Sequence, residues 1–143
     1  MYRIVEDNGE LYNWIKDSDD NYETLPNDLT IGLFNGKVLL AGVVYSVTCK
    51  NICYITIKTA SPKWCTKANL SRLFELPFEV FKVKVVKCAT SHKNKRINRL
   101  LTKRKLREEG YLRYSRPDGS HERVFSLTLK ELKNKEWYRK WEK

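Results

Sequence analysis

The chain of 143 residues is 41% hydrophobic and 12% aromatic, which suits one packed domain over residues 1–143 and excludes an intrinsically disordered chain. Its 28 Lys and Arg residues against 17 Asp and Glu give a net charge of +11, which favours an anionic partner: nucleic acid, an acidic protein or a polyphosphate cofactor. The sequence shows no signal peptide and no long apolar run, so we expect a cytoplasmic protein with no membrane partner.

The first half of the chain predicts a sheet with one helix. We expect a strand at 2–5, an amphipathic helix within 9–18, a polar loop at 17–26, a hairpin at 29–47 and a strand at 52–60. The hairpin prediction depends on Asn35-Gly36, because this pair adopts the positive φ angles of a type I′ turn.

The second half predicts alternating helices and strands: a helix at 68–81, a strand at 83–90, a helix at 91–107, strands at 110–116 and 121–129, and a helix at 129–141. Pro77 should end or kink the first of these helices, since proline has no N–H to donate. Pro117-Asp118-Gly119 predicts a turn between the last two strands. The alternation implies a βαβ crossover, so we expect a mixed α/β sheet with helices on both faces.

Four cysteines, Cys49, Cys53, Cys65 and Cys88, are accompanied by only two histidines. No C-x-x-C pair is present, and zinc sites are commonly built from such pairs. We therefore expect no metal and four reduced thiols, as in most cytosolic proteins.

The segment at 91–107 is the most basic part of the sequence. Ile97, Leu100 and Leu101 form one apolar stripe, which leaves the cations on the remaining face. We favour a core-packing helix with a solvated basic back over a phosphate-binding surface. No second helix lies beside it for a helix-turn-helix, and no aromatic residues interleave with the cations. If the acceptor is a small molecule or peptide, residues 103–105 are not needed for function.

The strand-to-helix turn at 61–68 is a candidate anion site. Thr66 is placed to cap the helix, so the main-chain N–H groups of 65–68 would be free at the positive end of the helix dipole. Lys67 in this first turn opposes the dipole, and a bound phosphate would offset that repulsion. The alternative is an ordinary turn in which Lys67 points into solvent.

Four short motifs together resemble one known family. They are Trp64-Cys65-Thr66-Lys67, Pro77-Phe78-Glu79, the run 94–101 followed by Lys103 and Glu109-Gly110, and Pro117-Asp118-Gly119. Their order and spacing resemble the short, phage-encoded type of the GNAT superfamily of acyl-CoA-dependent N-acyltransferases. The resemblance implies an α+β fold with a mostly antiparallel central sheet that is flanked by helices on both faces.

The resemblance also implies a binding site for acetyl-CoA. The implied cofactor-binding residues are Ile57, Lys58, Thr59, Trp64, Cys65, Thr66, Lys67, Ala68 and Asn94. The main chain of 57–59 would pair with the pantetheine, and 64–68 would hold the pyrophosphate in place of the superfamily's glycine loop. Asn94 would bond to the pantetheine or its neighbouring loop, or would serve only as a helix N-cap. Lys93, Lys95 and Arg96 would attract the 3′-phosphate.

The implied reaction is direct transfer of an acetyl group to an amine on a small molecule, peptide or protein. No catalytic residue is assigned, because relatives place a Tyr where this chain has Leu101. Weaker candidates, for which structural roles explain the residue at least as well, are Cys88, His92, Glu108, Glu109, Tyr111 and Tyr114. The alternative function is a catalytically weak module of the same fold that binds or modifies nucleic acid or an acidic protein of a host.

Overall fold

The computed structural model describes residues 2–6, 9–16 and 29–140. In chain order the elements are β1 (Tyr2–Glu6), α1 (Glu10–Lys16), β2 (Leu29–Asn35), β3 (Val38–Cys49), β4 (Ile52–Thr59), the 3₁₀ helix η1 (Pro62–Trp64), α2 (Lys67–Val80), β5 (Val85–Ser91), α3 (Lys95–Lys103), β6 (Arg107–Leu112), β7 (Glu122–Thr128) and α4 (Leu129–Lys133). The loop expected at 17–26 lies outside the described residues. No helix among those described is long and apolar enough to cross a membrane.

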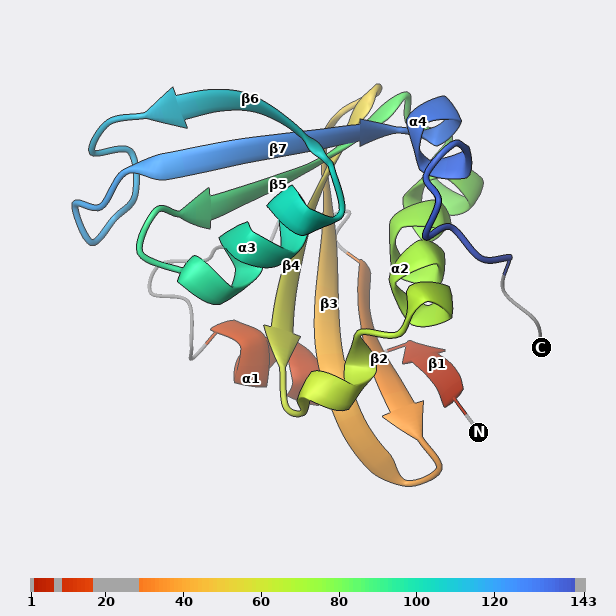
Figure 1. Ribbon diagram of the computed structural model, residues 1–143. Coiled ribbons are helices and arrows are strands. Elements are labelled where there is room, and N and C mark those ends of the chain that lie inside the picture. The colour runs from red at the N-terminus through yellow and green to blue at the C-terminus, as the bar shows by residue number, and fades with distance from the viewer. Residues whose placement is uncertain (1, 7–8, 17–28, 141–143) are drawn as a thin grey trace.

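The strands form one sheet in the order β1-β2-β3-β4-β5-β7-β6 (Figure 1). Every neighbouring pair is antiparallel except β4 with β5, which α2 joins as a parallel crossover. The mixed, mostly antiparallel sheet expected from the sequence is therefore confirmed.

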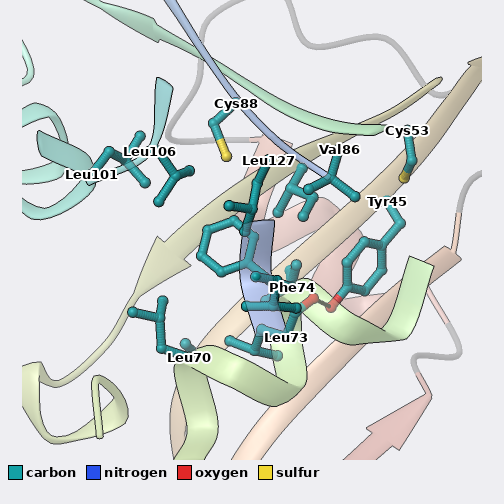
Figure 2. Packing of buried hydrophobic residues seen from close by; sticks show 14 of the residues in the cluster. Tyr45, Cys53, Leu70, Leu73, Phe74, Val86, Cys88, Leu101, Leu106 and Leu127 are labelled. Carbon is teal, nitrogen blue, oxygen red and sulfur yellow. Dashed lines mark hydrogen bonds between the residues drawn. The ribbon is translucent and has the colours of Figure 1, made fainter. Parts of the chain in front are cut away.

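The pleat of β3 assigns the helices to opposite faces of the sheet. Gly42 faces α1, since a Cβ atom there would lie 2.8 Å from the side chain of Ile15. Tyr45 is three residues further on and therefore faces the other way, where its hydroxyl bonds to α2. That second face carries the main core, to which α2, α3, α4 and β7 contribute Leu70, Phe74, Leu101, Leu132 and Leu127. Figure 2 shows the side chains from α2, α3 and β7 together.

The two predicted hairpins form with small shifts. The first turns at Gly36 and Lys37, and only Gly36 has a positive φ (+61°), which fits a type II′ turn rather than the expected I′. In the second, β6 starts and ends earlier than predicted, at Arg107–Leu112. Its expected turn is confirmed, because the N–H of Gly119 donates to the carbonyl of Arg116 at 2.9 Å.

The basic helix is shorter than the predicted 91–107. β5 takes the first of these residues, and α3 begins at Lys95. Asn94 caps it, since its side-chain oxygen accepts the N–H of Ile97 at 3.3 Å. The helix ends because Lys105 takes a φ of +61°, outside the helical region.

The C-terminal helix is likewise shorter than the predicted 129–141. Thr128 and Glu131 form a capping box at its start, but α4 has only 5 residues. Trp137 follows in the next segment, where it is 3% exposed and donates its Nε1–H to the carbonyl of Arg104 at 2.8 Å. Docking of this side chain on the end of α3 replaces the last turns of the expected helix.

Tyr45 compensates for the proline inside α2. In a regular helix the carbonyl of Leu73 would accept the N–H of residue 77, which Pro77 lacks. The hydroxyl of Tyr45 donates to that carbonyl instead, at 2.6 Å. Burial raises the pKa of Tyr45 well above its ordinary value, so the hydroxyl keeps its proton. α2 consequently continues to Val80, so of the two predicted effects of Pro77, an end or a kink, the end does not occur.

We expect Tyr45→Phe to lower the free energy of unfolding by about 1–3 kcal/mol, because it leaves the buried Leu73 carbonyl without its donor. Urea unfolding measures the change. In a Pro77→Ala background the helix supplies its own N–H, so the same substitution should cost clearly less. Equal costs in the two backgrounds would show that the hydroxyl does not stand in for the missing amide.

Candidate functional site

β4 and β5 separate after three paired residues. Residues 52–54 pair in parallel with 85–87, and beyond them β4 stays paired with β3 while β5 stays paired with β7. The facing edges of 55–59 and 88–91 therefore have no strand partner within the described sheet, and the two strands diverge in Figure 1. Main-chain groups on such edges need partners, and an extended ligand that carries amides can supply them.

A cavity of about 860 Å³ opens in this gap. Its volume falls within the range of roughly 300–1,000 Å³ that is usual for small-molecule sites. Apolar side chains of β4 and α3, among them Ile57, Ile97 and Leu100, line part of it. Polar groups come from β5 and from the loop between β6 and β7, so the cavity can hold an elongated ligand with both apolar and charged parts.

Six of the nine implied cofactor-binding residues line this cavity: Ile57, Lys58, Thr59, Trp64, Cys65 and Asn94. The remaining three, Thr66, Lys67 and Ala68, follow directly at the start of α2 but do not line it. The side chain of Lys58 also ties β4 to α1, because its Nζ donates to the carbonyl of Trp14 at 2.9 Å and lies 4.1 Å from the centre of that ring. Asn94 acts as the N-cap of α3, the alternative that the sequence left open.

The turn from β4 into α2 is held by side-chain hydrogen bonds. Thr66 caps α2 as predicted, since its hydroxyl accepts the N–H of Asn69 at 3.1 Å. Asn69 in turn donates from Nδ2 to the carbonyl of Trp64 at 3.0 Å. Trp64 and Asn69 are both buried, so the end of the turn that faces the cavity has little freedom to move.

The expectation of four free amides at this turn is wrong for two of them. The N–H of Cys65 donates to Pro62 at 3.4 Å and that of Thr66 donates to Trp64 at 3.0 Å, because η1 folds this segment before α2 begins. Lys67 and Ala68 occupy the first turn of α2, where no earlier helical carbonyl is available to their N–H groups. The candidate anion site is therefore narrower than predicted.

The end of α3 meets the start of α2 at Cys65. Burial raises the pKa of the Cys65 thiol, and the cations of Arg104 and Lys103 nearby oppose that rise. Arg104 is half-buried, and its Nε is buried without a hydrogen-bond partner among the described residues. The expectation that residues 103–105 are not needed with a small-molecule or peptide acceptor stays a prediction, and Arg104 among them lies beside Cys65 at the candidate anion site.

The side chains of Asn98 and Thr90 attach α3 to β5, and no sequence pattern selects either as a site residue. Asn98 is 3% exposed, donates from Nδ2 to the carbonyl of Ser91 at 2.9 Å, and accepts the hydroxyl proton of Thr90 at Oδ1. An asparagine among charged helix residues is expected to face solvent, so the sequence carried no signal for this burial. Thr90 and Ser91 line the cavity. Their hydrogen bonds to Asn98 therefore fix the position of α3, which forms one wall of the cavity.

Neither Leu101 nor Cys88 is placed to transfer a proton. Leu101 is buried in the core, and Cys88, although it lines the cavity, is 4% exposed. Burial and the neighbouring Cys53 raise the pKa of Cys88 to about 12, so this thiol is neither acid nor nucleophile near neutral pH. Cys88 is thus the buried structural cysteine that the sequence favoured.

The two adjacent glutamates are held in ion pairs away from the cavity. Glu108 accepts two hydrogen bonds from Arg123, at 2.6 and 2.9 Å, and these lower the pKa of its carboxyl group. Glu109 accepts from the hydroxyl of Ser126 and from Lys87, which likewise lower its pKa. Neither residue lines the cavity, so neither is placed as its general base.

The two histidines also lack a catalytic position. The N–H of His121 donates to Nδ1 of His92 at 2.9 Å, and the N–H of Tyr114 donates to Nδ1 of His121 at 3.0 Å. A backbone amide therefore contacts Nδ1 of each ring. Neither histidine lines the cavity. Among the described residues, no group of three or more His, Cys, Asp and Glu side chains is arranged to hold a metal ion.

Asp118 is the one carboxylate among the described residues that line the cavity. The sequence identified it only as part of a turn. The side-chain hydroxyl and the N–H of Ser120 donate to it at 2.6 and 2.9 Å, and these bonds, with Lys93 and Arg116 nearby, lower its pKa. A carboxylate that stays charged in this way suits the binding of an ammonium group better than the removal of a proton.

No protein-family model matches the sequence, and no curated protein sequence matches it. Solved structures are similar in fold. The spermidine/spermine N-acetyltransferase SpeG from Vibrio cholerae, in a mutant form, has a TM-score of 0.75 at 12% identity over 94% of this chain and 98% of that one. SpeG from the same organism in complex with CoA and spermine has a TM-score of 0.71 at 11% identity over 93% and 98%.

A presumed acetyltransferase from T. thermophilus has a TM-score of 0.63 at 22% identity, over 75% of this chain and 62% of that one. The described chain thus spans less than two thirds of that protein. At these identities the similarity establishes the fold, and the chain has the fold of GNAT-type acetyltransferases. The separated β4 and β5 edges with a cavity between them are the feature of this fold that concerns function.

We expect the four thiols, none of which forms a disulfide in the structure, to react in the order of their burial. Cys49 is exposed and should be alkylated first, Cys65 more slowly, and Cys53 and Cys88 only on unfolding, because the last two are buried. Timed alkylation followed by peptide mass spectrometry measures each rate in the native protein. Modification of Cys88 as fast as Cys49 would contradict the burial and the raised pKa.

Proposed function

We propose that this protein is an acetyl-CoA-dependent N-acetyltransferase that moves an acetyl group directly to an amine, in the cytoplasm. The observation that carries the proposal is the cleft between the separated edges of β4 and β5, lined by six of the nine residues that the sequence implied for the cofactor. Its unpaired main-chain groups, apolar walls and adjacent cations match the three chemical parts of coenzyme A: an amide chain, an adenosine and phosphates.

The open edge of β4 is assigned to the pantetheine. Successive strand residues direct their main-chain groups to opposite edges, so Lys58 faces β3, while Ile57 and Thr59 present their groups toward the cleft, where β5 does not pair with them. An amide chain that extends along this edge would satisfy them as an additional strand does. Ile97 and Leu100 of α3 line the cleft opposite β4 and would exclude water from the bound pantetheine.

The phosphates are assigned to the start of α2. The N–H groups of Lys67 and Ala68 lie at the positive end of the helix dipole. Arg104 of α3 lies beside Cys65, two residues before Lys67, and adds a second cation there. A phosphate here would also balance the cation of Lys67, which otherwise opposes the dipole. Lys93 and Arg96 line the cavity further along and are available to a second phosphate.

Acetyl-CoA would supply an acetyl thioester that is already activated for transfer. The chain must then hold an amine beside it and aim hydrogen-bond donors at its carbonyl oxygen. Main-chain N–H groups on the open edge of β4 suit the second task without a particular side chain. Asp118 suits the first, because a charged carboxylate in the cavity lining attracts an ammonium group that gives its proton to solvent.

The charge of the cavity does not favour a polyamine as acceptor. SpeG has been crystallised with spermine, but here four cationic side chains, Lys58, Lys93, Arg96 and Arg116, line the cavity against Asp118 as the single carboxylate of the described lining. Two of these cations, Lys93 and Arg96, are assigned to a phosphate of the cofactor, so the acceptor would meet Lys58, Arg116 and Asp118. One carboxylate offers a place for one ammonium group, so we propose an acceptor with a single amine, on a small molecule or a peptide.

The alternative is a binding module with little catalysis. It draws support from α3, whose cavity-facing residues Ile97 and Leu100 carry no group that protonates a leaving thiolate. A binding module would take up coenzyme A and acetyl-CoA but release no thiol with any acceptor. Turnover with an amine distinguishes the two functions.

Coenzyme A is expected to protect Cys65 from alkylation while leaving Cys49 unchanged, because Cys65 lines the cavity and Cys49 does not. Acetyl-CoA at about 100 times its Kd should raise the thermal midpoint by several degrees. Release of free thiol with a panel of monoamines then tests transfer. Unaltered Cys65 labelling together with an unaltered midpoint would refute cofactor binding in this cleft.

Lys67→Glu should weaken acetyl-CoA binding on the order of tenfold, because it places a negative charge beside the phosphates. The same change favours the helix dipole, so the thermal midpoint of the free protein should stay equal or rise. Calorimetry measures both. Lys84→Glu is the matched control, since Lys84 is exposed at the other end of the parallel pair, next to Asn51. Equal losses in both variants would show that only net charge matters.

A further inference from the structure

The cations of α3 form no ion pair with a described carboxylate. The ion pairs between described residues use Arg72, Lys87, Arg107, Arg116 and Arg123 as cations, and none uses a residue of α3. Four exposed cations, Lys95, Arg96, Arg99 and Lys103, thus lie on one short helix that contains no acidic residue. Ordinary solubilising surfaces mix the two signs, so this separation indicates an anionic partner.

Three sides of α3 have different surroundings. Ile97 and Leu100 face the cavity, Asn98 and Leu101 are buried against the sheet, and a third side is exposed. This exposed side, called the outer face below, carries Lys95, Arg99 and Lys103. These three are spaced four residues apart, a rise of about 6 Å at each step. That spacing is comparable with the distance between successive phosphates of a nucleic-acid strand.

An exposed group of aromatic rings lies beyond the start of the same helix. Tyr111 and Tyr114 are 53% and 72% exposed. Their ring centres lie 5.4 and 4.6 Å from that of His121, whose ring lies 4.7 Å from that of His92. We call these four residues the aromatic cluster. Tyr114 keeps its position with a φ of +57°, an unfavourable angle for a residue with a side chain.

The aromatic cluster and the outer face lie on the same side of the sheet. Tyr111 pairs with Arg123, which pairs with Thr90, so all three share one face. Thr90 bonds to Asn98 of α3, which places the helix on that face too. In Figure 1 the start of α3 and the loop between β6 and β7 also lie at the same end of the molecule. Cations and aromatic rings thus lie on one side of the sheet, and His92 of the aromatic cluster precedes Lys95 of the outer face by three residues.

We propose that this surface binds single-stranded nucleic acid, with phosphates on the outer face of α3 and bases stacked on Tyr111 and Tyr114. Stacking needs unpaired bases, which a duplex does not offer, and an acidic protein would use the cations but not the exposed rings. The outer face does not line the cavity. The proposal therefore does not depend on acetyl transfer and adds a second binding site to the proposed enzyme.

The test is fluorescence anisotropy with a labelled single-stranded RNA of mixed sequence and with its duplex, between about 50 and 200 mM salt. Substitution of Lys95, Arg99 and Lys103 by Ala should weaken single-strand binding and reduce its salt slope by about two units, since each phosphate contact contributes about 0.7. Lys50, Lys84 and Lys130, exposed outside this surface, form the control triple with the same charge change and should alter the slope much less.

Tyr111→Ala and Tyr114→Ala should each weaken single-strand binding by roughly five- to 100-fold at an unchanged salt slope, because a lost stacking contact carries no charge. Tyr111→Phe and Tyr114→Phe keep the ring and should bind like the parent protein. Saturating coenzyme A should leave the affinity unchanged. All these residues are exposed, and circular dichroism of each variant checks that it folds.

Equal losses in the α3 triple and the control triple would overturn the proposal in favour of a diffuse attraction by net charge. Duplex binding as tight as single-strand binding, with no effect of the tyrosine changes, would also overturn it. Displacement of the RNA by polyglutamate at equal charge, with the tyrosine variants unaffected, would assign the surface to an acidic polypeptide instead. Loss of RNA binding with coenzyme A would place the RNA in the cleft and refute a separate site.

Discussion

The interruption of pairing between β4 and β5 is the constraint on which the functional part of this molecule depends. Both strands keep their outer neighbours, so each remains part of a stable sheet while the edges between them open after Tyr54 and Lys87. A sheet normally satisfies its central main-chain groups internally. Here one row of them has no strand partner in the described sheet, and the cavity and the proposed cofactor site both follow from that gap.

The two helices next to the gap are fixed by polar contacts that face inward. Asn98 bonds to Ser91 and accepts from Thr90, so α3 cannot slide along β5 without losing buried hydrogen bonds. Asn69 and Thr66 fix the start of α2 in the same way. Rigid walls of this kind suit a site that must align two reacting groups, since positioning supplies much of the rate in a transfer that needs little acid–base help.

The same helix serves two environments. The cavity side of α3 carries Arg96 beside Ile97 and Leu100, its outer face is cationic and exposed, and its buried side attaches the helix to the sheet. Charge that is unfavourable for packing is therefore kept away from the core and made available to solvent. This arrangement explains how a helix with such a basic sequence can pack on the sheet.

Local residues determined the elements and the fold class, and the family resemblance implied six of the residues that line the cleft. Gly36 indicated the hairpin turn, the alternation of helices and strands predicted the crossover, and Thr66 indicated the start of α2. Each of these features depends on residues that are close together in the chain. Only the tertiary structure decided what depends on distant partners. The hydroxyl of Tyr45 bonds to α2 where Pro77 lacks an N–H, so the helix continues. Trp137 bonds to the carbonyl of Arg104, and the last helix ends before it. The fold of η1 gives hydrogen-bond partners to two of the four amides that were expected to be free. Tyr111 lies outside α3 in the sequence, so no helical periodicity relates it to the cations of that helix. Strand pairing through Arg123 and Thr90 places Tyr111 on the same side of the sheet as α3.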